Sequence, residues 1–446
     1  MFIPRSRTVS RSVAAPVLLA FALIARPALA QAPLAAADST PLTLRSVLAA
    51  VERANPRARA AAKLADAAEA RVPGSRRPPD PELQFGFMNY SLWRFAPDEA
   101  LGMRQLQLMQ MLPLPGKLAD AGSAARARAD AAQARSLDVR WVVRSQATAS
   151  FYDAWLAVER TAIARETRLL LENAATIATS MYRVGEGPQT DVLRARVALA
   201  GMEEEIIRMQ AMEQAARARL AAAADMPVDS LGGAPVPPAF PDSVPALSVL
   251  ERLAIEGRPM LAAGEAEVRA ASADARLARR ELWPDLQLGV QYGERGMAMG
   301  TDRMGSLMIG ASLPVFARSR QLRMREESAA MEGMAAADVS AMRAETRASV
   351  LEAHAELASA RRLATLYRMT VLPQAEAAAE SALASYRTGT VDFLTVLDNR
   401  MTVNRYREEL AALVAAEGRA WAELEMLTGR TLTNDSATAL PPGGTR

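Results

Sequence analysis

The chain lacks cysteine and contains a single histidine, His354, among its 446 residues. The absence of cysteine excludes disulfides, a lipid-modified N-terminal cysteine and thiol nucleophiles. One histidine cannot form a metal cluster of the histidine and cysteine type, so His354 is interpreted as an ordinary packing or surface residue of a long helix. The sequence contains neither a Gly-x-Ser-x-Gly motif nor a phosphate-binding loop. We therefore expect a protein that is not an enzyme and carries no cofactor.

Long hydrophobic runs are also missing, because no stretch after residue 30 approaches the ~20 apolar residues that a membrane-spanning helix requires. Near the N-terminus, three arginines precede an apolar run over residues 13–24, and Ala-Leu-Ala follows at 28–30. We interpret residues 1–30 as a secretory signal peptide with cleavage after Ala30. Subtracting its four arginines from the formal net charge of +3 leaves −1 for the mature chain. The basic pI therefore does not argue for nucleic-acid binding.

The sequence repeats one pattern twice, in the same order. The matching segments are Ser46-Val47-Leu48 with Ser248-Val249-Leu250, Pro81–Gly86 with Pro284–Gly289, Leu112-Pro113 with Leu313-Pro314, and Tyr182–Arg196 with Tyr386–Arg400. Their nearly constant offsets of 202, 203, 201 and 204 residues indicate an internal duplication. Proline-rich residues 232–245 cannot form a helix or a central strand. We therefore predict a first repeat at 31–231, a connector at 232–245, a second repeat at 246–429 and a disordered tail at 430–446.

Very long helices are predicted in both repeats. Residues 117–181 contain one glycine and no proline, which predicts a single helix of roughly 65 residues and ~95 Å. Its counterpart at 318–386 is interrupted only by Pro373. Apolar ridges at steps of three and four residues indicate helices packed side by side in coiled-coil fashion. These ridges are Leu193, Val197 and Ala200 in the first repeat and Leu394, Leu397 and Met401 in the second.

Four shorter segments predict β-strands, namely Glu82–Tyr90, Met103–Leu112, Asp285–Tyr292 and Ser306–Val315. Three of them alternate apolar with polar or small residues, whereas Met103–Leu112 alternates poorly. Such alternation over roughly ten residues suits a tilted transmembrane strand, and it suits a soluble two-sided sheet equally well. Four strands cannot close a barrel, and lipid does not tolerate open sheet edges, so the membrane alternative requires an oligomer.

Taken together, these features resemble the TolC-like outer-membrane factors, the outer membrane efflux protein family, over residues 41–429. The resemblance is carried by the duplicated Tyr-Arg-x-Gly segments, by Leu-Pro-Leu-Pro-Gly-Lys at 112–117, by the weaker Leu-Pro-Val-Phe-Ala-Arg at 313–318 and by the signal peptide. It implies a mainly α fold with long antiparallel helical hairpins that form a tunnel across the periplasm. It also implies a homotrimer whose chains each contribute four strands to a twelve-stranded transmembrane β-barrel in the outer membrane.

The resemblance further implies partners and a function. The trimer would dock onto a periplasmic adaptor protein and an inner-membrane pump and act as a passive efflux conduit for metal ions or drugs. Adaptor docking is expected at the periplasmic hairpin tips, at Tyr182, Arg183, Gly185, Tyr386 and Gly389. Two other function classes stay open, a soluble periplasmic coiled-coil protein of the adaptor type and an exported hydrolase. The hydrolase would need a nucleophile and a base that this composition hardly supplies.

A gate at the periplasmic entrance is also implied by the resemblance. Asp398 would form an acidic ring, with Thr395 at a place where many members carry a second acid. A lock between the tips that uses a tyrosine, an arginine and an aspartate finds Tyr386 and Asp191 here. Val391 occupies the place of the arginine. The alternative is that Asp398 is an exposed helix acid and Asp191 a helix cap.

The missing arginine leaves two possibilities for this lock: it is absent, or Arg387 or Arg194 supplies the charge. A separate hypothesis concerns Met297, Met299 and Met304, which crowd a predicted extracellular hairpin loop. Thioethers are soft ligands for Cu(I), although methionine also fills irregular apolar gaps. These three residues are therefore weak candidates for a metal contact.

Overall fold

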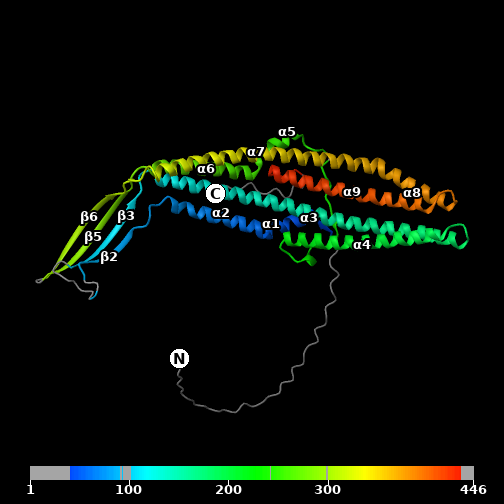
Figure 1. Cartoon of the computed structure of the whole chain (residues 1–446), viewed down its shortest axis with the longest axis horizontal. Coiled ribbons are helices and arrows are strands. Elements are labelled where there is room, and N and C mark those ends of the chain that lie inside the picture. Colours follow the sequence, from blue (N-terminus) through cyan, green and yellow to red (C-terminus); the bar gives the residue numbers. More distant parts are fainter. Residues whose placement is uncertain (1–40, 91–92, 94–101, 242, 298–299, 433–446) are drawn as a thin grey trace, which may run out of the picture. The chain divides into compact units, whose positions relative to one another are not determined.

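Long helices and one four-stranded sheet dominate the computed structural model, which describes residues 41–90, 93, 102–241, 243–297 and 300–432 (Figure 1). All of these residues lie within one compact unit, Thr40–Arg446. The predicted signal peptide at 1–30 and residues 433–446 of the predicted tail lie outside the described residues. The expected mainly α fold with a small β part is confirmed.

The two repeats have the same order of elements. In the first repeat these are β1 Leu42–Thr43, α1 Leu44–Ala54, α2 Pro56–Ser75, β2 Glu82–Met88, β3 Met103–Leu112, α3 Lys117–Arg183 and α4 Gln189–Ala223. The short helix η1, Val228–Ser230, and strand β4, Pro235–Val236, follow. The second repeat contains α5 Leu247–Gly257, α6 Pro259–Arg280, β5 Leu286–Met297, β6 Gly300–Ala311, α7 Gln321–Leu366, the π-helix η2 Tyr367–Val371, α8 Leu372–Arg387 and α9 Phe393–Thr428.

Helix α3 has 67 residues, which at ~1.5 Å per residue corresponds to roughly 100 Å. Its counterpart begins at Gln321 rather than Arg318, because residues 317–320 form turns after Pro314. Pro373 does not break this second helix. A proline clashes with the carbonyl four residues earlier, here that of Met369, and the widened π turn Tyr367–Val371 accommodates it.

The four long strands form one antiparallel sheet in the order β2-β3-β5-β6. Because β3 pairs with β5, the sheet contains strands of both repeats. The boundaries of the repeats at 31–231 and 246–429 stay predictions. The register places Leu108 opposite Leu83 and Val290, and Val290 opposite Leu307. None of the helices in the described ranges combines the length and hydropathy of a membrane-spanning helix.

Three of the four predicted strands had wrong boundaries. β2 ends at Met88 rather than Tyr90, because Asn89 has a positive φ of 53° that turns the chain. β5 and β6 extend to Met297 and from Gly300, so Met304 lies in a strand and not in a loop. Opposite charges sustain this extension, since Glu294 faces Arg303 across the two strands. β6 ends at Ala311 rather than Val315, because proline at 314 cannot donate to the ladder.

The register sorts the side chains of the sheet into two unlike faces. The aliphatic face, as we call it, carries Leu83, Phe85, Phe87, Leu106, Leu108, Leu112, Leu286, Leu288, Val290, Tyr292, Leu307 and Ile309. The opposite glutamine face carries Gln84, Gln105, Gln107, Gln287, Gln291, Ser306, the charged residues Glu82, Arg295 and Asp302, and several glycines and methionines. Met103–Leu112 alternates leucine with glutamine and methionine, except that Arg104 and Gln110 lie on the aliphatic face.

The junction between the sheet and the helices is fixed by a buried lysine. The Lys117 ammonium donates to the Trp283 carbonyl oxygen at 3.0 Å and to Asp285 Oδ1 at 2.8 Å. The same carboxylate oxygen accepts a bond from the backbone N–H of Leu114 at 3.1 Å. Lys117 is one of the buried polar residues of the chain. These contacts tie the start of α3 and the loop before it to the loop before β5.

The helices pack through small residues. α3 lies against α2, α4, α6 and α9, and many of its buried positions are alanines, which let helix backbones approach closely. The expected ridge on α4 is not part of this packing. Leu193 and Val197 are exposed in the protomer, and the buried side of α4 instead presents Asp191, Ala195 and Met202.

Candidate functional site

The two helical hairpins turn at corresponding places, between α3 and α4 and between α8 and α9 (Figure 1). Gly185 and Gly389 have φ of +80° and +73°, and nothing lies within 4 Å of a Cβ built on either residue. The left-handed backbone, and not lack of space, therefore requires glycine. The glycine N–H groups bond the carbonyls of Tyr182 and Tyr386, while those of Glu186 and Thr390 bond Met181 and Ser385. Tyr-Arg-x-Gly is thus a repeated helix-stop signal of the Schellman type.

The hairpin tips meet at a buried tyrosine–aspartate hydrogen bond. The Tyr386 hydroxyl at the end of α8 donates to Asp191 Oδ2 in the first turn of α4, at 3.1 Å. The side chains are 3% and 5% exposed, and the ring of Phe393 packs edge-on against Tyr386 at 5.5 Å. Burial and the bond to Asp191 raise the pKa of Tyr386 to about 12. The tyrosine therefore stays a neutral donor at all physiological pH values.

Asp191 is not a helix cap. The N-cap position of α4 is Pro188, and no side chain caps that helix end. The alternative interpretation of Asp191 is therefore wrong: its carboxylate serves the contact between the hairpins. The surrounding core consists of small and aromatic residues from all four helices, Ala174, Ala178, Ala195, Ala382, Tyr386, Phe393 and Val396.

The second tip contains an acid that sequence reasoning missed, Asp392. Its Oδ1 accepts bonds from the Thr395 backbone N–H at 3.0 Å and from the Thr395 hydroxyl at 2.5 Å, which caps α9. These bonds lower the pKa of the Asp392 carboxyl, and the positive charge of Arg194 acts in the same direction. An aspartate three residues before a threonine at a helix start was the available signal. Arg194 therefore acts electrostatically on Asp392 at the second tip, while its role in a lock stays a prediction.

The other predicted gate residues lie in the open. Asp398 and Arg387 are exposed, and within the described residues neither forms a hydrogen bond or an ion pair. Tyr182 differs sharply from its repeat counterpart, because its side chain is 46% exposed whereas Tyr386 is buried. Arg183 and Gly185 are exposed beside Tyr182. The structure thus brings together Tyr386, Asp191 and Phe393, whereas Tyr182, Arg183 and Gly185 at the turn of the first hairpin are exposed.

No group of histidine, cysteine, aspartate or glutamate in the described ranges could hold a metal ion. Of the three methionines suggested by the sequence, Met299 and the side chain of Met297 lie outside the described residues. Met304 lies in β6 on the glutamine face. A methionine cluster in the hairpin loop therefore stays a prediction, because only the side chain of Met304 is described and it lies in a strand.

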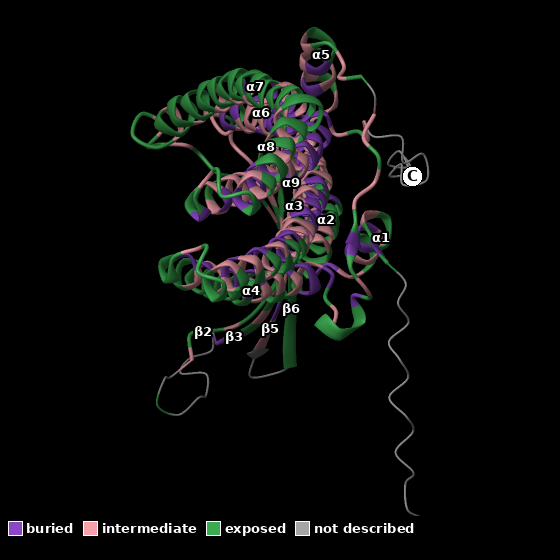
Figure 2. Cartoon of the chain, turned by 90° about the vertical axis from the view of Figure 1, so that its right-hand side faces the viewer, coloured by how far each residue is buried: buried purple, intermediate pink, exposed green. Residues whose placement is uncertain are grey.

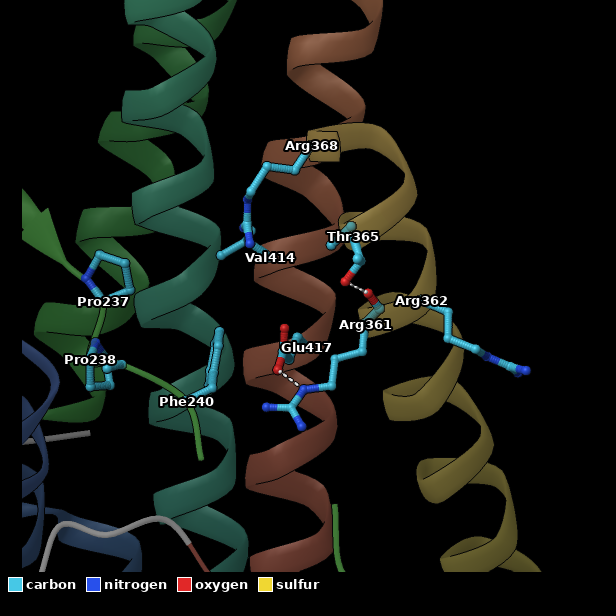
Figure 3. Close-up of a pocket in the computed structure, with 11 residues that line it drawn as sticks. Pro237, Pro238, Phe240, Arg361, Arg362, Thr365, Arg368, Val414 and Glu417 are labelled. Carbon is cyan, nitrogen blue, oxygen red and sulfur yellow. Dashed lines mark hydrogen bonds and ion pairs between the residues drawn. The ribbon is translucent and has the colours of Figure 1, made fainter. Parts of the chain in front are cut away.

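A surface cavity of about 710 Å³ lies where the connector crosses the helices (Figure 3). Pro237, Pro238 and Phe240 line one side, and Arg361 and Arg362 from α7 line the other. Arg361 Nε donates to Glu417 Oε1 of α9 at 2.8 Å, whereas Arg362 extends away from Glu417. The charge of Arg361 is thereby compensated within the protomer. No nucleophile–base pair is present among the residues that line this cavity.

Comparison with known proteins shows which family this chain resembles. Residues 250–430 match the family described as Outer membrane efflux protein. The chain is 27% identical over 399 residues to the cobalt-zinc-cadmium resistance protein CzcC of Cupriavidus metallidurans, covering 87% of this chain and 90% of that one. The second half of the chain thus resembles the outer membrane efflux proteins, and the similarity to CzcC extends over most of its length.

Other relatives agree with this assignment. The pyoverdine export outer membrane protein OpmQ of Pseudomonas putida is 26% identical over 295 residues, covering 61% of this chain and 59% of OpmQ. The outer-membrane channel OprN has the same fold, with a TM-score of 0.74 at 20% identity over 86% of this chain and 89% of OprN. VceC of Vibrio cholerae also reaches 0.74, at 17% identity over 86% of this chain and 96% of VceC.

The matched descriptions refer to efflux, metal resistance, pyoverdine export and outer-membrane channels. The family description and the names of OpmQ and OprN place those proteins in the outer membrane. These similarities favour the channel over the exported hydrolase and the soluble adaptor. Buried side-chain hydrogen bonds join the two hairpins of this chain, among them Tyr386–Asp191 at the tips and Thr167–Asn404 between α3 and α9.

Proposed function

We propose that three copies of the chain form a channel with a twelve-stranded barrel and a helical tunnel, docked onto a periplasmic adaptor and an inner-membrane pump. The aliphatic face of the sheet carries this proposal. Leu307 and Ile309 are 70% and 73% exposed, and the other large side chains of that face are also mostly accessible. Strand β6 is drawn in the colour of exposed residues in Figure 2. A contiguous exposed surface of this kind is not stable in water, and it suits lipid contact.

The edges of the sheet support the trimer. β2 and β6 each pair on one side only, so both present unpaired backbone groups. Unpaired groups are not tolerated in the hydrocarbon core, and four strands are too few to close a barrel. Pairing β6 of one copy with β2 of the next closes the barrel and satisfies both edges.

The helices support the same assembly, because equivalent residues of the two hairpin tips have different surroundings within one chain. Repeat symmetry matches Tyr386 with Tyr182 and Asp191 with Thr395, at the offset of 204 residues. Within one chain, Tyr386 contacts Asp191, while Tyr182 is exposed and Thr395 faces no tyrosine. In a ring of alternating hairpins, Tyr182 would contact Thr395 of the neighbouring copy. The exposed ridge of Leu193 and Val197 would be covered by the same neighbour.

Engineered cysteines test this arrangement without interference, because the chain has no cysteine of its own. We expect Tyr182→Cys with Thr395→Cys, treated with a bismaleimide about as long as a tyrosine side chain, to give covalent dimers and trimers on denaturing gels. The matched pair Tyr386→Cys with Asp191→Cys should cross-link within one chain and leave its mass unchanged. Monomers from the first pair in outer-membrane preparations would refute the ring.

The tips are proposed as the gate and the adaptor-docking surface. Three exposed Asp398 carboxylates around a threefold axis would concentrate negative potential at the entrance, and Arg194 beside Asp392 would supply the positive charge of the lock. The exposed first tip, with Tyr182, Arg183 and Gly185, and the second tip at Gly389 offer the adaptor its contacts. The whole-length similarity to a cobalt-zinc-cadmium resistance protein supports metal ions as cargo.

The acidic ring is testable by conductance. Asp398→Asn should reduce cation preference and divalent-cation block in planar bilayers while trimers stay intact, because it removes three charges at the entrance. The exposed Glu380→Gln on α8 is a matched control and should leave both properties unchanged. Equal selectivity of the Asp398 variant and the wild type would make Asp398 an ordinary surface acid.

A further inference from the structure

The methionines of the sheet lie on one face only. Six methionines with described side chains occur in the four long strands, and all six belong to the glutamine face. They are Met88, Met103, Met109, Met111, Met304 and Met308. Conversely, all Leu, Ile, Val, Phe and Tyr residues of the described strands belong to the aliphatic face. The chain therefore does not use methionine and leucine interchangeably in this sheet.

This separation excludes the usual reason for methionine. A residue that only fills apolar gaps would occur on the aliphatic face at least as often, since leucine and methionine have similar volume and polarity. On the face lined by glutamine, serine and glycine, the branched hydrocarbons are absent and thioethers take their place. The property that distinguishes methionine from leucine is its soft, polarisable sulfur, which accepts soft cations.

Glycines on β5 bring the methionine side chains of neighbouring strands together. Gly289 lies between Met109 of β3 and Met308 of β6 in one row of the sheet. A Cβ on Gly289 would lie 3.6 Å from Met109 Cγ and 3.2 Å from Met308 Cε, so both side chains extend over this glycine. Two thioethers from different strands thus converge on one point of the glutamine face.

A second convergence lies four residues further along β5, at Gly293. The Met103 sulfur would be 2.7 Å from a Cβ on Gly293, so it lies directly over that glycine. Met304 is the residue paired with Gly293 on β6, and Met88 is paired with Met103 on β2. The two glycines have no side chain, and the methionine side chains of neighbouring strands occupy the space above them.

We propose that the glutamine face carries thioether sites for soft monovalent cations, Cu(I) or Ag(I), with Met109 and Met308 over Gly289 and Met103, Met304 and Met88 around Gly293. This inference deepens the proposed channel and rests on it for the position of the face toward the water-filled interior. Because thioethers are neutral, they bind a soft monovalent cation without the additional electrostatic attraction of a charged ligand. Zinc sites in proteins use thiolate, imidazole or carboxylate ligands. Near the two glycines, the described part of this face carries one carboxylate each, Glu82 opposite Met109 and Asp302 opposite Arg295, and neither a thiol nor an imidazole. One carboxylate alone does not complete a zinc site.

The test uses the full protein in detergent, with Ag(I) as the probe, because silver needs no reducing agent. Calorimetric titration should show Ag(I) binding, and X-ray absorption at the silver edge should show sulfur neighbours. Volume-conserving substitution by leucine should preserve the packing while removing the sulfur. We expect binding to weaken at least tenfold in the quadruple variant M103L/M109L/M304L/M308L.

Two further variants keep the result interpretable. Four leucines at exposed methionines of the helices, M324L/M331L/M334L/M369L, should bind Ag(I) as the wild type does. M109L/M308L should lose the Gly289 site and keep sulfur coordination at the Gly293 site, with a lower stoichiometry. Zn(II) should bind the wild type and the quadruple variant equally. The proposal is overturned if silver in the wild type has no sulfur neighbours, or if the quadruple strand variant binds Ag(I) as tightly as the helix control.

Conductance of the same preparation separates this inference from the proposed function. A protein that forms pores and does not bind Ag(I) through sulfur refutes the thioether sites and leaves the channel intact. A protein that binds Ag(I) through the strand methionines and forms no pore refutes the channel and leaves the sites. In pores that do bind, Ag(I) should alter the conductance of the wild type and not that of the quadruple strand variant.

Discussion

Removing one hydroxyl at the hairpin tips tests the central contact between the two hairpins. In Tyr386→Phe the ring still packs against Phe393, while the Asp191 carboxylate, 5% exposed, loses the bond from Tyr386. A hydrogen bond to a charged group contributes about 1.5–3 kcal/mol, and the buried carboxylate is left short of a donor. Because about 1.4 kcal/mol is a factor of ten, local opening of the tips should become about ten to a hundred times more frequent.

Hydrogen exchange at neutral pH measures this opening directly. Amides near the ends of α8 and α4 should exchange about ten to a hundred times faster in the variant, and amides in the sheet should be unchanged. Tyr406→Phe is the matched control, since its hydroxyl has no hydrogen-bond partner among the described residues, and it should change the opening free energy by under about 0.5 kcal/mol. Tip exchange in Tyr386→Phe within twofold of the wild type would refute the reasoning.

The titration of the tyrosine offers a second measurement on the same pair. Its pKa is raised from 10.0 to about 12, so the neutral form is favoured in the folded protein. The contribution of the contact is therefore complete below pH 10 and is lost as the pH rises from 10 through 12. The tyrosinate absorbance of the wild type minus that of Tyr386→Phe should show a late-titrating phenol. A difference curve centred near pH 10 would contradict the buried bond.

Three further predictions concern the junction, the sheet and the turns. Lys117→Met should destabilise the protein by about 3–5 kcal/mol in thermal unfolding, because it leaves the Asp285 carboxylate without its counterion, and adding Asp285→Leu should restore part of the loss. Leu288→Lys should cost about 2–4 kcal/mol if the aliphatic face contacts lipid at mid-depth, whereas Gln287→Lys should be mild, and equal loss of trimer in both would reverse the assignment of the faces. Gly389→Ala should lower the local stability of the tip by about 1–2 kcal/mol, because φ is +73° and an alanine side chain disfavours the left-handed backbone, while its Cβ contacts nothing. Hydrogen exchange measures this change, and an unchanged exchange rate would show that the turn does not need a left-handed glycine.

The amino-acid sequence by itself determined the elements whose causes are local. The run without proline at 117–181 determined a single long helix, and the glycines of the two Tyr-Arg-x-Gly segments determined where the hairpins turn, because only the left-handed backbone at that position ends the helix. Alternation of side chains likewise identified the four strands, since successive residues point to opposite faces. The strand ends were less certain because pairing partners, such as Glu294 with Arg303, lie in another strand.

Only the tertiary structure decided which members of equivalent pairs perform a role. Tyr182 and Tyr386 occupy the same place in the same motif, yet Tyr182 is exposed and Tyr386 is buried against Asp191. The difference arises because the side of α8 that carries Tyr386 faces the first hairpin, whereas Tyr182 is not part of the core between the hairpins. The methionines of β3 looked like breaks in the alternation until the register placed them with Met304 and Met308 on the glutamine face. Burial and strand register depend on residues distant in the sequence, so no local pattern could supply them.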